Sequence, residues 1–324
     1  MNFFKKIFPD PLLFYLLIAL ILAYILPEIS LIKWGSVDLD LIIDIGVLSV
    51  FFFYGLKLNW KEVFNDIKNW KFHIKVQLIT FLLFPLLGIL FYPFAFFSPE
   101  YYTLFLSIFY LCSLPSTVSS SVVMVSLAKG NVTKAIFNAS VSGLIGIILT
   151  PLWMSLFLKN TNDIESTSVF LDLSIKVLLP VFIGAILQPY LGKFYSKYKN
   201  TFSNIDKLTI VLIVFNSFSH NFLNNYFKDI SYYYLIICLI SVVILFLFVF
   251  YFLEFLNNKL WKYSKPDFIT LQFCGTKKSL VHGSVIGSIL FGNEIGIYLL
   301  PIMLYHTFQL VFISYKSTIY AKED

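Results

Sequence analysis

A long apolar stretch near the end of the chain is interrupted in its middle by the polar run CGTKKS at residues 274–279. Its flanks, residues 268–274 and 280–291, are each too short to span a bilayer, because a spanning helix needs about 20 residues. The run carries two adjacent lysines, Lys277 and Lys278. A charged side chain at that depth is costly, and it marks a functional site in membrane proteins. The simplest prediction is one membrane helix that unwinds at its centre, which is tolerated only against protein or a water-filled cavity.

The first half of the chain holds a matching stretch, residues 101–128, which is interrupted by SLPSTVSSS at residues 113–121. Pro115 removes a backbone donor and blocks the preceding turn, and the hydroxyls around it offer the freed backbone other partners. Both interrupted stretches run on to a Gly-Asn pair, at residues 130–131 and 292–293. Two interrupted segments at matching places in two halves of a chain indicate the binding site of a secondary transporter.

The composition places the chain in a membrane. Of its 324 residues, 58% are hydrophobic and 13% are charged, whereas a soluble domain carries about 25% charged residues. A soluble protein is therefore excluded, and the formal net charge of +6 does not indicate a nucleic-acid partner. The three cysteines all lie in apolar segments, so neither a disulfide framework nor a metal site is expected. We expect no cofactor, and we expect the partners to be the lipid bilayer and a small molecule.

Polar connectors divide the chain into ten apolar segments, which predict an all-α integral membrane protein with ten transmembrane helices. The approximate segments are 10–26, 39–57, 73–95, 101–128, 132–157, 169–190, 206–226, 231–256, 267–291 and 294–315. The interrupted segments are the fourth and the ninth. Because they lie five apart, they run through the membrane in opposite directions. The chain is thus expected to form a single membrane domain of two inverted five-helix repeats, residues 1–158 and 159–324, in which helices 4 and 9 are discontinuous.

The distribution of lysine tests this segmentation. Eighteen of the 24 lysines lie in loops or at segment ends on one side of the membrane, whereas the other side has Lys33, Lys159 and Lys228. Lys176, Lys277 and Lys278 lie deeper inside segments. By the positive-inside rule, both termini face the cytoplasm. We therefore expect a multi-pass protein of the cell membrane, which is the inner membrane in a bacterium.

Several motifs together carry a family resemblance: LPSTVSSSVV at residues 114–123, LAKGNV at 127–132, NASVSGL at 138–144, LTP at 149–151, TKKS at 276–279 and YHTFQ at 305–309. They fall in the right segments and in the right order, and the similarity covers nearly the whole chain. The chain resembles the bile acid:sodium symporter superfamily, and within it the divergent SBF-like branch. The resemblance implies a core domain of helices 3–5 and 8–10, in which the broken helices 4 and 9 cross, and a panel domain of helices 1, 2, 6 and 7. It also implies transport of organic anions, often with sodium, by alternating access.

The residues that hold sodium in this family are largely replaced in this chain. Members with characterised sodium sites have a glutamate and a glutamine in the ninth segment, Ser-Asn in the fourth and hydroxyl ligands in the fifth. The matching positions here are, in the same order, Phe273 and Lys277, Ser121 and Val122, and Ala135 and Ala139. The resemblance therefore carries over the fold but not the sodium site, and coupling to Na⁺, to H⁺ or to neither stays open.

Lys277 and Lys278 are the first candidates for the site. An ammonium group there would stand where a coupling cation otherwise sits and would neutralise the carbonyl ends of the broken helix, or it would bind an anionic substrate directly. Because neighbouring helical residues point about 100° apart, only one of the two is expected to face the centre, and we favour Lys277. The alternative is that the long side chains extend to the membrane interface.

The hydroxyl-rich break of the fourth segment is the second candidate, and polar groups of helices 3, 5 and 10 add to it. The half-helix that starts near Ser119 would point its positive end at the centre, which suits an anion. The alternatives are a proline kink whose hydroxyls bond their own carbonyls and ordinary hydrogen bonds between helices. The residues assigned to the substrate or ion path are Gln77, Thr80, Pro115, Ser116, Thr117, Ser119, Ser120, Ser121, Asn138, Thr276, Lys277, Lys278, Ser279, His306 and Gln309.

These features predict a secondary active transporter of a small organic anion, without enzymatic activity. The alternative is a non-transporting membrane regulator of ion or metabolite flux with the same fold, which the replaced sodium ligands motivate. An intramembrane enzyme would need clustered catalytic groups, but His73, His220, His282 and His306 are scattered along the chain. The sequence leaves the substrate, the direction of transport and the oligomeric state open.

Overall fold

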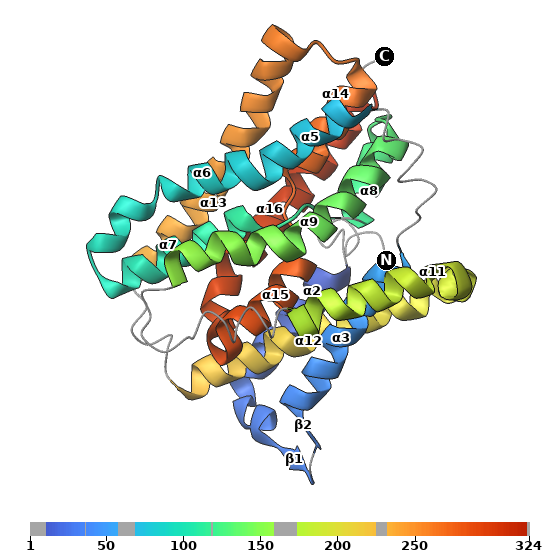
Figure 1. The fold of residues 1–324 in the computed structure, drawn as a ribbon. Coiled ribbons are helices and arrows are strands. Elements are labelled where there is room, and N and C mark those ends of the chain that lie inside the picture. The colour runs from blue at the N-terminus through green and yellow to red at the C-terminus, as the bar shows by residue number, and fades with distance from the viewer. Residues whose placement is uncertain are drawn as a thin grey trace. The chain divides into compact units, whose positions relative to one another are not determined.

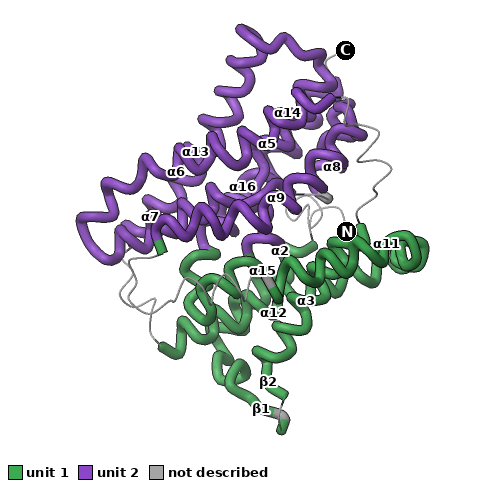
Figure 2. The backbone as a smooth tube through the Cα atoms, in the orientation of Figure 1, with its two compact units in different colours: residues 1–59, 158–230, 284–299 green, residues 60–157, 231–283, 300–324 purple. Residues whose placement is uncertain are grey.

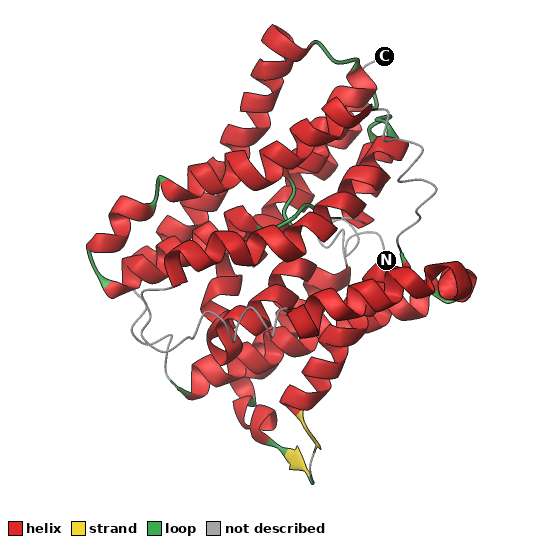
Figure 3. Cartoon of the chain, viewed as in Figure 1, coloured by secondary structure: helices red, strands yellow, loops and turns green. Residues whose placement is uncertain are grey.

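The computed structural model describes residues 11–35, 37–57, 69–117, 119–158, 174–224 and 232–322, and this part of the chain is almost entirely helical (Figures 1 and 3). The longer helices are α2 (Pro11–Ile25), α3 (Leu39–Leu56), α5 (Trp70–Leu78), α6 (Phe84–Ile89), α7 (Pro99–Ser113), α8 (Ser119–Leu127), α9 (Val132–Leu158), α11 (Leu179–Lys197), α12 (Lys199–Leu223), α13 (Tyr232–Leu256), α14 (Lys265–Thr276), α15 (Leu280–Phe291) and α16 (Ile295–Tyr320).

Short 3₁₀ or π-helical turns connect or extend these helices: η1 (Pro27–Leu31), η3 (Ile79–Leu83), η4 (Tyr92–Phe96), η5 (Ser174–Leu178), η6 (Asn257–Trp261) and η7 (Gly292–Glu294). The strands β1 (Lys33–Trp34) and β2 (Val37–Asp38) pair as a small antiparallel ribbon. It leads into α3, whose first turn is capped by the Asp38 side chain, which accepts a 2.9 Å hydrogen bond from the Leu41 amide.

Helices occupy the apolar segments that the sequence predicts. α7 and α8 fill the fourth segment and α14 and α15 fill the ninth, so both predicted interruptions are confirmed. α12 begins seven residues before the expected position 206, and α16 continues five residues past the expected end at 315. The start of the expected segment 169–190 lies outside the described residues.

Within the described residues, six helical stretches have the length and apolar composition needed to cross a membrane: Leu39–Leu56, Trp70–Phe96, Val132–Leu158, Ile175–Lys197, Tyr232–Trp261 and Lys265–Tyr320. The last of these contains α14, α15 and α16. Such a set of helices is typical of an integral membrane protein, in agreement with the class predicted from composition.

The chain divides into two compact units, coloured separately in Figure 2. The first unit contains residues 1–59, 158–230 and 284–299, and the second contains residues 60–157, 231–283 and 300–324.

The first unit is built around the packing of α3 against α11. Both helices have a glycine at the crossing: a Cβ on Gly55 would overlap the carbonyl of Val181, and one on Gly184 would overlap the carbonyl of Phe52. Small residues let membrane helices approach closely enough for van der Waals packing. Because neither position has room for a methyl group, the two glycines set the distance between the helices.

Two ion pairs add to the first unit. The Nζ of Lys57, at the end of α3, lies 2.8 Å from a carboxylate oxygen of Asp206 in α12. The Nζ of Lys176, one of the lysines that the sequence places inside a segment, lies 3.0 Å from a carboxylate oxygen of Asp44 in α3. Both pairs join segments that are far apart in the sequence.

The second unit holds both helix breaks. Its aromatic core includes Phe246 and Phe250 of α13, whose rings contact Phe312 of α16 edge to face. α9 approaches the break that follows α7 at Gly146, where a Cβ would lie 2.6 Å from the ring of Pro115. Glycine is therefore required at this position if the proline is to keep its place against α9.

Candidate functional site at the helix breaks

The first break follows directly from the proline. Leu114 is extended, with φ −72° and ψ 151°, because a residue before proline is excluded from the helical region. α7 therefore ends at Ser113, and the next helix begins at Ser119. Val118 and the side chain of Ser119 lie outside the described structure.

The second break contains no proline, and a side chain from another helix holds its backbone in place. Lys277 is extended, with φ −81° and ψ 143°. The side chain of Gln309 in α16 takes over the hydrogen bonds that the helix would have made: its Oε1 accepts from the Lys278 amide and its Nε2 donates to the Lys278 carbonyl, both at 2.9 Å. Nε2 also lies 2.8 Å from Nδ1 of His306. The predicted site residues Gln309 and His306 thus support the backbone of the break.

The two breaks contact each other. The Ser279 amide donates a 2.9 Å hydrogen bond to the Pro115 carbonyl, and the Ser116 hydroxyl donates a 2.6 Å bond to the Cys274 carbonyl. The Ser116 amide donates to the hydroxyl of Ser142 in α9 at 2.9 Å. Backbone groups that lost their helical partners are therefore satisfied across the break, as burial requires.

Lys278 holds the carbonyl groups at this junction. Its Nζ donates to the backbone carbonyls of Thr80, Cys112 and Leu114 at 2.8, 2.7 and 2.8 Å. We expected an ammonium group at the carbonyl ends of the broken helix, but we favoured Lys277 for that place. The structure corrects this choice, because Lys278 makes these contacts.

Lys277 extends instead toward the hydroxyl groups at the start of α8. Its Nζ donates to the Ser120 hydroxyl at 2.9 Å. Ser120 and Ser121 in turn lie 2.9 and 2.8 Å from the Thr117 hydroxyl. Both lysine side chains are fully buried, so the alternative in which they extend to the membrane interface is excluded.

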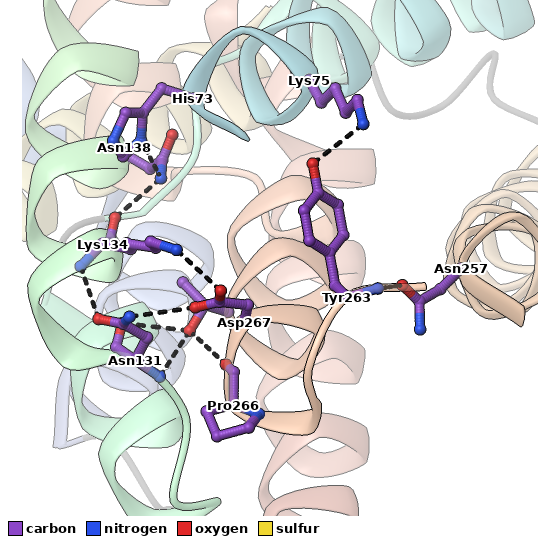
Figure 4. Close-up of polar contacts among 10 residues, drawn as sticks. His73, Lys75, Asn131, Lys134, Asn138, Asn257, Tyr263, Pro266 and Asp267 are labelled. Carbon is purple, nitrogen blue, oxygen red and sulfur yellow. Dashed lines mark hydrogen bonds and ion pairs between the residues drawn. The ribbon is translucent and has the colours of Figure 1, made fainter. Parts of the chain in front are cut away.

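A second polar network joins α5, α9 and α14 (Figure 4). Asn138 Nδ2 lies 2.9 Å from His73 Nδ1 and donates to the Lys134 carbonyl at 2.8 Å. Gln77 Nε2 donates to the side-chain and backbone oxygens of Asn138, both at 3.3 Å. The Lys134 ammonium pairs with Asp267 at 2.8 Å. The predicted site residues Gln77 and Asn138 thus belong to this network, while the carbonyl of Thr80, one turn further along, reaches Lys278.

Gln77 and His73 also line a cavity of about 640 Å³. Its other walls are apolar or aromatic and come from α5, η3 and α9. They include Trp153, whose indole nitrogen donates to the Phe81 carbonyl at 2.9 Å. Such a pocket, with a few polar groups on apolar walls, has the usual composition of a small-molecule site.

Tyrosine residues contribute to the junction although sequence reasoning did not assign them to the site. Tyr110 donates to the Gly283 carbonyl and Tyr305 to the Thr276 carbonyl, each at 2.6 Å. A buried tyrosine hydroxyl needs a partner, so a tyrosine in the middle of an apolar segment was a usable signal.

Most of the positions that match the family's sodium ligands have no side-chain oxygen in this chain. Phe273 is buried and stacks on Tyr320 with ring centroids 6.0 Å apart, and Ala135 and Ala139 are fully buried in α9. Carbon side chains cannot coordinate a hard cation, which takes oxygen ligands. At these three positions, the departures noted in the sequence are therefore packed apolar side chains.

Comparisons with known proteins agree with the motifs. The SBF-like CPA transporter family (DUF4137) matches residues 10–322. The putative symporter YfeH of Escherichia coli is 33% identical over 82% of this chain and 80% of its own length. The uncharacterized protein PA2026 of Pseudomonas aeruginosa is 30% identical over 98% of this chain and 94% of its own length. Sodium/bile acid cotransporter 7 of Xenopus tropicalis is 29% identical over 82% of this chain and 78% of its own length.

The match covers nearly the whole chain, including both breaks and the helices that pack against them. The resemblance seen in the motifs is confirmed. The chain belongs to the SBF-like CPA transporter family and is a membrane transporter of the bile acid:sodium symporter kind.

Proposed function

We propose that this transporter is a secondary carrier that moves a small organic anion by alternating access around the two helix breaks. The observation that carries the proposal is the pair of buried ammonium groups, those of Lys277 and Lys278, at the point where the breaks meet. Broken helices at the centre of a membrane protein are where secondary transporters bind their substrates.

The charges at the junction favour an anion. A lysine near the middle of the bilayer costs about 2.5–3.5 kcal/mol on insertion scales. The acceptors of the Lys278 ammonium group are neutral carbonyls, so they solvate its charge without cancelling it. α8 and α15 both begin next to the breaks, and the amino end of a helix is electropositive. A bound anion would offset these positive charges.

The cavity lined by Gln77 and His73 supports a substrate with an apolar body. Its walls suit a hydrocarbon skeleton, and the polar network at its rim suits a polar or charged group. A relative is named a sodium/bile acid cotransporter, and bile acids are amphipathic anions of this kind. We therefore choose taurocholate as one test substrate, together with the short anions succinate and pyruvate.

Alternating access follows from the proposed architecture. The ten segments form two inverted repeats, residues 1–158 and 159–324. Helices 3–5 and 8–10 form the core, and helices 1, 2, 6 and 7 form the panel against which the core moves. The lysine-rich loops and both termini face the cytoplasm, and a bacterial cell would carry the protein in its inner membrane.

Uptake into proteoliposomes tests the proposal. Purified protein is reconstituted, and uptake of labelled taurocholate, succinate and pyruvate is followed under a sodium gradient, a pH gradient and neither. We expect uptake of at least one of these anions, and its loss in Lys277→Met. Lys193→Met, which removes an exposed lysine of α11, serves as the matched control. Normal uptake by Lys277→Met would contradict the role of Lys277, and binding without flux would favour the non-transporting regulator.

A further inference from the structure

The contacts of the Lys278 ammonium group differ from those of an ordinary buried lysine. Its three hydrogen-bond acceptors, the carbonyls of Thr80, Cys112 and Leu114, are all backbone groups and lie 2.7–2.8 Å away. The ring of Phe84 also lies beside the ammonium group, with its centroid 4.2 Å from Nζ. An ammonium group over an aromatic face is attracted by the ring quadrupole. Together these groups form a cage for one positive charge, here called the carbonyl cage.

The carbonyls of the cage are available because irregular backbone frees them. In a regular helix the Thr80 carbonyl would accept from the Phe84 amide, but that amide donates to Ile79 in the π-turn η3, and Pro85 has no amide to offer. The Cys112 carbonyl would accept from the Ser116 amide, which donates to a hydroxyl of α9 instead. The cage is thus built by two prolines and the turns they distort.

The number of acceptors indicates that the group held in the carbonyl cage is a cation. An ammonium group has three protons, one for each carbonyl, whereas a neutral amine would turn its lone pair toward a carbonyl lone pair. Unwound backbone carbonyls at the ends of half-helices are also the ligands with which secondary transporters hold Na⁺. The carbonyl cage therefore has the chemistry of a monovalent cation site, and a side chain of the protein occupies it.

We propose that Lys278 is a tethered cation, which fills a site for a monovalent ion and makes transport by this protein independent of sodium. The Gln309 side chain holds the backbone of Lys278 in place, since it binds both the amide and the carbonyl of that residue. The first half of the proposal concerns the cage alone. The second half, on sodium, rests on the transport function proposed above.

Chemical rescue of Lys278→Ala tests the cage. This variant empties the cage, and thermal unfolding of the protein in detergent is measured in the chloride salts of sodium, potassium, ammonium, methylammonium and N-methylglucamine at equal ionic strength. We expect the Tm of Lys278→Ala to fall and to recover in a saturable way with the small cations, but not with N-methylglucamine, which is too large for the cage. Wild-type protein and Lys277→Ala should respond equally to all five salts. A Lys278→Ala variant no more sensitive to cations than wild type would overturn the proposal.

A second arm uses wild-type protein and therefore does not depend on the folding of the variant. A saturable stabilisation of wild type by sodium over N-methylglucamine would overturn the proposal, whereas equal Tm values in the two salts would support it. In proteoliposomes, the uptake rate should be unchanged when N-methylglucamine replaces sodium on both sides. Absence of uptake in both salts would contradict the transport function, but it would not affect the Tm result on the carbonyl cage. Uptake that requires sodium would overturn the proposal that Lys278 is a tethered cation and would leave the transport function standing.

Discussion

The Ser116 hydroxyl donates a 2.6 Å hydrogen bond to the Cys274 carbonyl, so a side chain of the first break satisfies the backbone of the second. Both residues are fully buried. The carbonyl belongs to the last turn of α14, where helical carbonyls have no partner in their own helix. The bond therefore ties the two breaks together and also gives a hydrogen-bond donor to a carbonyl at the end of α14.

Replacing this hydroxyl should destabilise the junction. In Ser116→Ala the Cys274 carbonyl stays buried without that donor, which costs about 1–3 kcal/mol. We expect a lower Tm in detergent. The matched control is Ser126→Ala, which removes an exposed hydroxyl of α8 and should leave the Tm unchanged. If the two variants unfold at the same temperature, the bond contributes no stability.

The contact between Gly146 and Pro115 gives a second prediction. In Gly146→Ala the new methyl group would lie 2.6 Å from the proline ring, so either α9 or the break must shift. Overpacking of this kind costs about 1–3 kcal/mol, and the shift should also reduce uptake in proteoliposomes. Gly192→Ala is the control, because its methyl group would meet only the flexible end of Gln188. Equal stability and uptake of the two variants would show that the close approach is unimportant.

The positions of the helix breaks could be predicted because their causes are local. A proline acts on the residue before it, and the extended backbone of Leu114 is that effect. The Lys277–Ser279 break could be predicted from its polar residues within an apolar stretch. Its support by Gln309 of α16, by contrast, is a contact across 31 residues, and no local pattern specifies it.

The roles of the two lysines could not be predicted, because the wrong local geometry was assumed. The choice of Lys277 used the 100° rotation between helical neighbours. The backbone at Lys277 is extended, however, and successive side chains of extended backbone point to opposite sides. The two lysines therefore reach different partners, Lys277 the half-buried Ser120 and Lys278 the carbonyl cage. The same limit applies to Tyr110, whose partner Gly283 is 173 residues away.

The ion pair between Lys57 and Asp206 predicts that the folded protein loses stability at alkaline pH. Burial is the largest single effect and lowers the pKa of Lys57, but the Asp206 carboxylate 2.8 Å away and the nearby Tyr195 together raise it by more, so the pKa lies above the ordinary value of 10.5. Because the folded pKa exceeds the unfolded one, this contribution is complete below pH 10.5 and is lost as the pH rises through the folded pKa. In Asp206→Asn the alkaline loss of Tm should be smaller than in wild type. Parallel curves of Tm against pH for the two proteins would contradict this.

The pair of Lys134 and Asp267, which joins α9 to α14 (Figure 4), should be coupled more strongly than a surface pair. The two side chains are 12% and 22% exposed, and Asn131 Nδ2 also donates to Asp267 at 3.1 Å. Pairs on open surfaces contribute about 0.2–1 kcal/mol, so we expect a coupling of more than about 1 kcal/mol in a double-mutant cycle of Lys134→Met and Asp267→Asn. Unfolding of the four proteins in detergent measures it.

The cycle needs a control because Lys134 also lies over the ring of Phe72, 4.7 Å from its centroid. Lys134→Met alone loses that contact together with the ion pair, but the coupling energy cancels whatever is lost in both backgrounds. Asp267→Asn combined with Lys259→Met, an exposed lysine of η6, should be additive. Additivity in both cycles would mean that the hydrogen bond from Asn131, and not the charge of Lys134, holds Asp267 in place.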